Sequence, residues 1–283
     1  MIKRSLFIFL ACTILYAIVS PHLAPIVTGA NQRQGNVIRA QRYLYGSDGS
    51  WSSVIVGSSL ANKIVATNLP GYYNLAFDGL GNFDGLNVLV QSKHLPKTVF
   101  IEMNEALRRQ SSSLSASLFT PGLSQLRAAL PFLREDSEPA LLLRRVIEAR
   151  KRDMPLAGTN DMMMNTVVFN SQLAYLVELD SHIPDADVIR QCFDQLSSYV
   201  NELNKRGVSI VFFEMPVDTN ICQSPRAKAI RAAFYEHFPT NLFRYINQPD
   251  CAAYQTSDGM HLPPTQALKY TEYFRSQVKC STQ

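Results

Sequence analysis

The chain has 283 residues, of which 46% are hydrophobic and 18% are charged, values ordinary for a folded globular protein. These values exclude a fibrous or largely disordered chain, and the length suits one α/β domain with a buried core. A net charge of +4, without RNA-binding, zinc-finger or basic-region motifs, gives no support to nucleic-acid binding, so we predict no nucleic-acid partner.

The N-terminal segment, residues 1–30, has the layout of a signal peptide or signal anchor. Lys3 and Arg4 precede an apolar run over 6–19. That run is shorter than the roughly 20 residues of a spanning helix, but residues 23–27 can extend it. We expect an uncleaved membrane anchor with the following domain outside the cytoplasm. A cleaved signal peptide and a buried N-terminal helix are the alternatives.

The cysteines indicate the redox compartment. Cys12 lies in the apolar run, which leaves Cys192, Cys222, Cys251 and Cys280, an even number that fits an oxidising compartment. Cys222 and Cys251 flank a predicted helix-and-strand unit, so we predict that these two form a disulfide. Four buried thiols remain the alternative.

The first half of the chain after the anchor alternates strands with helical segments. Residues 31–50 are polar and are expected to form a linker. Apolar and β-branched runs predict three strands. They cover 53–57, 72–76 and 97–103. Residues 59–65 are expected to form the first turns of a helix, and 83–90 a second helix.

Residues 105–165 fit this alternation poorly and are expected to form a helical insertion, with helices near 123–133 and 139–151. Up to Arg152 the segment carries nine Lys/Arg and five Asp/Glu, a net charge of +4. We expect it to cap the carboxyl edge of the sheet, with arginines facing anionic lipid headgroups or an acidic glycan. A solvated insertion without a partner is the alternative.

Regular alternation returns after residue 184. Apolar residues at spacings of three and four predict a helix that begins near Asp185 and ends near Gly207. A strand over 208–214, a helix over 225–238, a strand over 242–246 and a final helix after Pro264 follow. Five strands alternating with helices predict a three-layer, flavodoxin-like α/β/α domain over 51–283, with a mostly parallel five-stranded sheet.

Ser59 is the candidate nucleophile. It follows the first predicted strand and precedes a helix, the place where an α/β fold exposes reactive groups. N–H groups at a helix start favour negative charge, so the same position can help to bind an oxyanion. Serine is also a common N-cap residue, which is the structural alternative.

His261 is the candidate base, and Asp258 is the candidate carboxylate that orients it. An imidazole accepts a serine proton efficiently only when a third group fixes its tautomer, and an aspartate three residues earlier can do so. A simple Asp-Gly turn next to a surface histidine is the alternative.

Four short blocks together resemble the SGNH (GDSL-like) hydrolase family. Gly57-Ser58-Ser59-Leu60 is similar to the family's Gly-Asp-Ser-Leu, with Ser58 in place of the aspartate. Residues 74–79, residues 102–105 and the Asp258/His261 pair resemble the later blocks. The resemblance implies a catalytic triad of Ser59, Asp258 and His261, and an oxyanion hole formed by Ser59, Gly79 and Asn104.

The resemblance further implies ester hydrolysis or O-acyl transfer through an acyl-enzyme, without a metal or other cofactor. The anchored architecture resembles a branch that contains polysaccharide O-acetyltransferases, which implies an extracytoplasmic glycan substrate and a multi-spanning acyltransferase partner. Glu102 replaces the family's glycine, which implies either a narrower acyl pocket or an altered choice of acceptor. A catalytically inactive binding or assembly protein with the same fold is the alternative.

Overall fold

The structure is a computed structural model that describes residues 2–46, 51–152 and 165–280. The chain divides into two compact units, each described by itself. Unit 1 comprises Met1–Gly46 and Ser112–Gly158, and unit 2 comprises Ser47–Ser111 and Thr159–Gln283.

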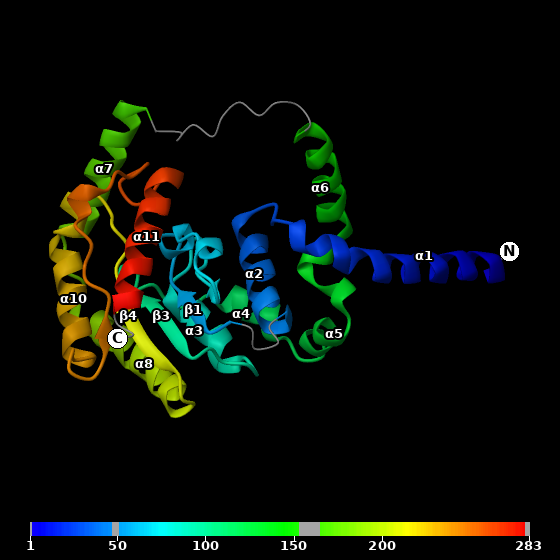
Figure 1. The fold of residues 1–283 in the computed structure, drawn as a ribbon, viewed down its shortest axis with the longest axis horizontal. Helices are drawn as coiled ribbons and strands as arrows, with labels where there is room; N and C mark the ends of the chain where they lie inside the picture. The colour runs from blue at the N-terminus through cyan, green and yellow to red at the C-terminus, as the bar shows by residue number, and fades with distance from the viewer. Residues whose placement is uncertain (1, 47–50, 153–164, 281–283) are drawn as a thin grey trace. The chain divides into compact units, whose positions relative to one another are not determined.

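Unit 2 contains a five-stranded sheet in which every neighbouring pair is parallel (Figure 1). The strands are β1 (Ser53–Val56), β2 (Tyr72–Asn74), β3 (Thr98–Glu102), β4 (Ser209–Phe213) and β5 (Arg244–Tyr245), and their order is β2-β1-β3-β4-β5. The predicted α/β class and parallel sheet are confirmed. In this order β2 lies on one side of β1, and β3, β4 and β5 follow on the other side. The point between β1 and β3, where the connections leave in opposite directions, forms a crevice at the carboxyl ends of the strands.

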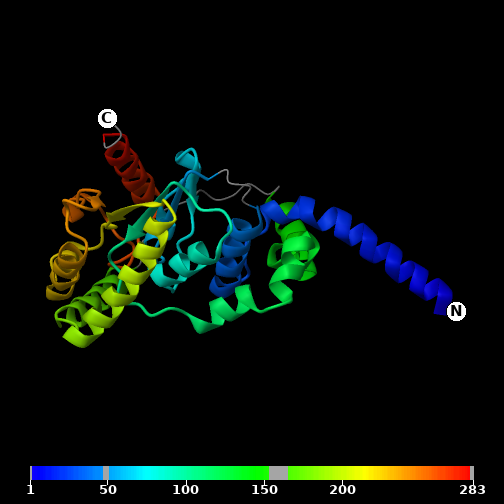
Figure 2. The same cartoon turned by 90° about the horizontal axis from the view of Figure 1, so that it is seen from below.

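Helices cover both faces of this sheet (Figure 2). The helices of unit 2 are α3 (Asn82–Gln91), α7 (Thr166–Asp180), α8 (Ala186–Lys205), α9 (Thr219–Cys222), α10 (Pro225–His237) and α11 (Pro264–Cys280), with 3-10 turns η2 (Ala61–Lys63), η3 (Ala66–Asn68) and η6 (Cys251–Ala253). Alternate strand residues point to opposite faces. Phe212 therefore packs against Phe234 of α10, with ring centroids 5.1 Å apart, and Phe213 packs against Phe274 of α11 at 5.4 Å. These contacts make the three layers.

Two local expectations were wrong. The segment expected to begin a helix at 59–65 forms only the short turn η2, because the chain must return at once to β2. The segment 31–50 contains the helix α2 (Gln32–Gly46), where a linker was expected. Its apolar face is narrow: Val37, Ala40 and Tyr43 are buried at helical spacing among polar residues.

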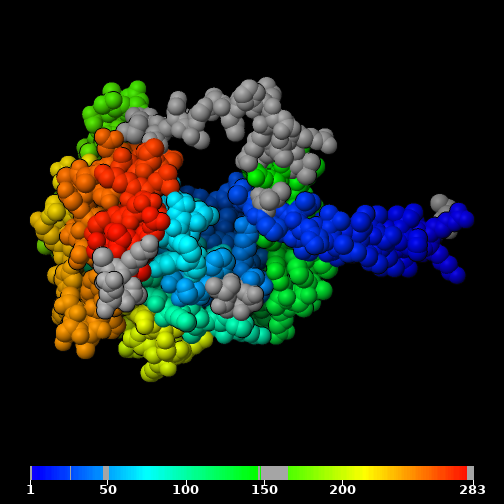
Figure 3. Space-filling view, viewed as in Figure 1, coloured from blue at the N-terminus to red at the C-terminus, as the bar shows by residue number. Residues whose placement is uncertain are grey.

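Unit 1 is helical over its described residues. It contains α1 (Ile2–Leu23), η1 (Ala24–Ile26), α2, α4 (Ser112–Phe119), α5 (Leu123–Ala129), η4 (Pro131–Leu133), η5 (Glu135–Ser137) and α6 (Pro139–Arg152). α1 is long and apolar enough to cross a membrane, a property shared by anchors and signal sequences. Its first half stands clear of the rest of unit 1 (Figure 3). The helices predicted near 123–133 and 139–151 are present as α5 with η4 and as α6.

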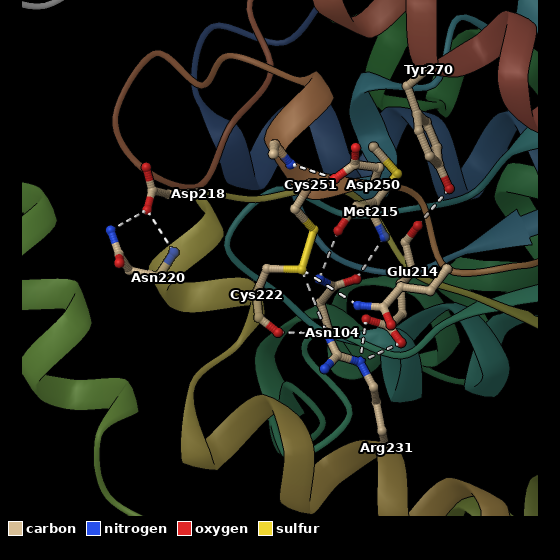
Figure 4. Close-up of a disulfide and its surroundings, with 12 residues drawn as sticks. Asn104, Glu214, Met215, Asp218, Asn220, Cys222, Arg231, Asp250, Cys251 and Tyr270 are labelled. Atoms are coloured by element: carbon tan, nitrogen blue, oxygen red, sulfur yellow. Dashed lines mark hydrogen bonds and ion pairs between the residues drawn. A yellow bond between two sulfur atoms is a disulfide. The ribbon is translucent and has the colours of Figure 1, made fainter.

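Cys222 and Cys251 form a disulfide, which confirms the predicted pair (Figure 4). Cys222 ends α9 after β4, and Cys251 begins η6 after β5. The bridge therefore ties together the segments that follow two neighbouring strands. Cys12 is an exposed free thiol and Cys192 a buried one.

Replacing both bridged cysteines should destabilise unit 2. The disulfide closes a ring over a sequence separation of 29. In the chain-entropy description, such a ring raises the free energy of unfolding by about 3–4 kcal/mol because it restricts the unfolded chain. The Cys222→Ala/Cys251→Ala variant should therefore unfold at lower urea than the native protein, and reductant should shift only the native protein. Cys192→Ala is the matched control. Equal urea midpoints with and without reductant would contradict a stabilising bridge.

Candidate active site

The turn that carries Ser59 lies at the carboxyl end of β1. Gly57 is needed there because a Cβ atom at this position would overlap the side chain of Glu102. The turn is held from the neighbouring strand, since the amide of Asn74 donates to the carbonyls of Ala61 and Ile64 at 2.9 and 3.0 Å. Ser59 thus lies on a short turn that is held by hydrogen bonds from β2.

Ser59, His261 and Asp258 form a continuous hydrogen-bonded chain. The Oγ of Ser59 lies 2.8 Å from Nε2 of His261, and Nδ1 of His261 lies 2.7 Å from Oδ2 of Asp258. The structure therefore brings together three residues that the sequence separates by as many as 202 positions. An aspartate on Nδ1 leaves Nε2 facing the serine hydroxyl, the arrangement in which imidazole can accept its proton.

Asp258 is held as a carboxylate. Partial burial opposes its ionisation, but hydrogen bonds from the side chain and backbone N–H of His261 and from the backbone N–H of Met260 outweigh burial. These bonds lower the pKa of Asp258 to about 2. The group is therefore charged near neutral pH and can stabilise an imidazolium on His261.

The turn between these two residues depends on Gly259. Its φ of 91° lies in the left-handed region, and its carbonyl accepts the backbone N–H of Asp218 at 2.9 Å. A Cβ atom there would also lie 3.2 Å from side chains of Leu173 and Leu176 on α7. The Asp-Gly sequence thus forms the turn considered as an alternative, and the same turn places His261 against Ser59.

Glu102 lies beneath the Ser59 turn. Its buried carboxylate accepts the backbone N–H of Ser58 at 2.8 Å, the hydroxyl of Ser58 at 2.9 Å and the backbone N–H of Ala61 at 3.1 Å. Burial raises the pKa of Glu102 to about 7, and the bonds from Ser58 and Ala61 oppose that rise. Glu102 does not line the cleft beside Ser59, so the structure gives no support to a narrower acyl pocket; its carboxyl group bonds to the Ser59 turn instead.

An open cleft of ≈ 450 Å³ lies beside Ser59 and His261. One wall comes from α7, which the sequence analysis did not predict. The lining residues are Ser59, Leu60, Glu105, Arg108, Gln172, Leu176, Leu179, Asp180, Arg226, Asp258, Met260 and His261. Apolar residues at 173, 176 and 177, spaced as on a helix face, were the signal that could have revealed α7.

The rim of this cleft is charged. Arg226 lies 3.7 Å from Asp180, and Arg108 lies 3.2 Å from Glu105. Burial raises the pKa of Asp180, an effect that Arg226 partly opposes. Leucines of α7 and Met260 supply the apolar part of the lining. The cleft therefore offers hydrogen-bonding and ionic groups around a small apolar surface next to Ser59.

The two remaining predicted residues lie nearby but differ in setting. Gly79 has a φ of 71°, and its carbonyl accepts the guanidinium of Arg108, a cleft residue, at 2.9 Å. The amide of Asn104 donates to the carbonyl of Met215 at 3.0 Å and accepts its N–H at 2.8 Å (Figure 4). Asn104 thereby links the ends of β3 and β4. It lines an adjoining cavity of ≈ 40 Å³ that shares four residues with the cleft.

Among the residues that the structure describes, no group of three or more His, Cys, Asp or Glu side chains could hold a metal ion.

Glu102→Gln should change how stability depends on pH. The raised pKa means that folding favours the protonated carboxyl, so this contribution is complete below the ordinary value of 4.5 and is lost as pH rises through about 7. The native protein should therefore lose about 3 kcal/mol relative to the variant over this interval, at 1.36 kcal/mol per pKa unit. Urea unfolding of both proteins at several pH values measures this. A difference that does not vary with pH would contradict it.

No protein-family model and no curated protein matches the sequence. One solved structure is similar, that of a Streptococcus pneumonia protein provisionally described as a platelet activating factor. The identity is 10% and the TM-score 0.46, over 89% of this chain and 93% of that chain.

Proposed function

We propose that this protein is a serine-dependent esterase or O-acyltransferase of the SGNH type. The observation that carries the proposal is the hydrogen-bonded chain from Ser59 through His261 to Asp258 at the carboxyl edge of the sheet. His261 accepts the proton of Ser59 as its Oγ attacks an ester carbonyl. Asp258, charged near neutral pH, stabilises the resulting imidazolium.

The tetrahedral oxyanion requires donors beside Ser59. The proposal assigns them to the backbone N–H groups of Ser59 and Gly79 and to the amide of Asn104. One N–H of the Asn104 amide is used by Met215, and an amide carries two. Collapse of this intermediate expels the alcohol, which takes the proton from His261 and leaves an acyl group on Ser59.

The acyl group then passes to water or to a hydroxyl of an acceptor. The cleft beside Ser59 is open and bears Arg108, Gln172, Asp180 and Arg226, groups that can hydrogen bond to a polyhydroxylated chain. These groups support a glycan as the ester-bearing substrate or as the acceptor. A multi-spanning acyltransferase partner would supply the acyl group in the transfer reaction.

Two features support a location outside the cytoplasm. α1 is apolar and long enough to cross a membrane, and unit 2 contains a disulfide. Disulfides persist mainly in oxidising compartments. The proposal therefore places unit 2 outside the cytoplasm, attached to the membrane by α1.

The nucleophile can be tested with a fluorophosphonate probe, which reacts with activated serines. Ser59→Ala should abolish labelling. Ser58→Ala should still be labelled, because the Ser58 hydroxyl is buried and bonded to Glu102. Gel fluorescence of the full-length protein in detergent measures both. Labelling that survives Ser59→Ala would remove Ser59 from the proposed role.

Asn104→Asp tests the oxyanion role of the amide. The carboxylate keeps an acceptor for the N–H of Met215 but loses both amide N–H donors, the one bonded to the Met215 carbonyl and the one proposed for the oxyanion. The rate on an activated acetyl ester should therefore fall by roughly 100- to 1,000-fold, as for loss of one oxyanion donor. Initial rates and the melting temperature should be measured together. A near-native rate in a folded variant would show that Asn104 serves only to link β3 to β4.

A further inference from the structure

We infer that one surface of unit 1, formed by α5, η4 and α6, lies on an anionic lipid bilayer beside α1. This inference rests on the proposed role of α1 as a retained membrane anchor. Several large apolar side chains on this surface are not covered by other described parts of the protein. Its exposed large hydrophobic residues are Leu123, Leu126, Leu130, Leu133, Leu143 and Ile147.

The first argument is the length of α1 that is free to enter lipid. Tyr16 packs edge-to-face on Phe132 of η4, with ring centroids 6.4 Å apart, and its hydroxyl donates to the carbonyl of Ser137. Ser20, one turn further, is fully buried. The part of α1 before Tyr16 is largely exposed. This part, residues 2–15, has fourteen helical residues and spans about 21 Å.

A hydrocarbon core is about 30 Å thick, so this free length falls short by about 9 Å, or roughly six residues. If α1 crosses the bilayer, lipid must therefore extend along α1 to about Pro21. At that depth the side chains of Ile18 and Val19 are still exposed. The protein that packs on Tyr16 and Ser20 must then lie at the membrane boundary.

The second argument is the position of the exposed leucines. Leu130 precedes the η4 turn and Leu133 ends it, and Phe132 of this turn packs on Tyr16 of α1. α5 precedes η4 and contacts it, and α6 follows η5 and contacts it. Within unit 1, α5 and α6 lie on the side from which α1 extends, and α2 lies on the other (Figures 1 and 2). The two helices that carry the exposed apolar residues thus lie where α1 leaves unit 1.

The third argument is charge. Leaving out Lys3 and Arg4, which precede the apolar run of α1, unit 1 contains ten Lys/Arg and five Asp/Glu, a net charge of +5. Three of the five acids are engaged within unit 1. Asp136 pairs with Arg42, and Glu135 and Glu138 accept hydrogen bonds from Gln34. A basic unit with exposed leucines matches an anionic interface, where apolar side chains enter the headgroup boundary and cations attract the lipid charge.

A depth measurement on the full-length protein in vesicles tests this inference. In a Cys12→Ser/Cys192→Ala/Cys280→Ser background, a fluorescent label is placed at Leu130→Cys or Leu143→Cys. The control is Leu242→Cys, a position in unit 2 that is 75% exposed. The vesicles contain phosphatidylcholine with phosphatidylglycerol. Quenching is compared between a lipid with a nitroxide near its headgroup and aqueous iodide.

The labels at 130 and 143 should lose emission to the nitroxide lipid and be shielded from iodide, whereas the label at 242 should show the reverse. Iodide quenching at all three positions would overturn the inference, because this surface of unit 1 would be in water. Shielding from both quenchers would also overturn it, since a protein surface would then cover the leucines.

A separate Cys192→Ala/Cys280→Ser variant, which keeps the native Cys12, carries a label that monitors the anchor itself. Quenching of this label by a nitroxide deep in the acyl chains is expected. If it stays accessible to iodide, α1 does not cross the bilayer and the inference falls with it. The fluorophosphonate result for Ser59 is independent of that outcome, so failure of the membrane surface and failure of the hydrolase proposal are distinguishable.

Discussion

The candidate site depends on the hydrogen bonds between the buried carboxyl group of Glu102 and the turn that carries Ser59. Glu102 ends β3, and the turn it supports begins at the end of β1, so one side chain fixes two neighbouring strand ends. Two backbone N–H groups and a hydroxyl converge on its oxygens, so the buried carboxyl group does not lack hydrogen-bond partners. The glycine at 57 is the counterpart of this arrangement, because any larger residue would displace the carboxylate.

The sheet and its helices could be predicted because their signals are local. Apolar runs bounded by turn residues gave all five strands, and helical spacing gave α8 with its start at Asp185 and its stop at Gly207. The cysteine pair could be predicted because Cys222 and Cys251 flank one predicted helix-and-strand unit. These features need no knowledge of distant contacts.

What the sequence analysis missed depends on contacts between distant segments. The role of Glu102 is visible only once β3 lies beside β1, since the side chain acts on residues 44 positions away. The pairing of the Asn104 amide with Met215 has the same origin, across 111 positions. α7 was missed because its apolar residues serve the cleft and the Asp258 turn, and they give a weaker pattern than the core helices.

The contact between Ser59 and His261 also determines when the site can form during synthesis. The serine turn emerges early, but its base follows 202 residues later, and α11, which packs on the sheet through Phe274, follows His261. Contacts of such high sequence separation form late, because a long loop must first close. A nascent or prematurely ended chain can therefore complete β1 and its turn without containing a base for Ser59. The proposed chemistry thus becomes available only to a chain that has been synthesised beyond His261.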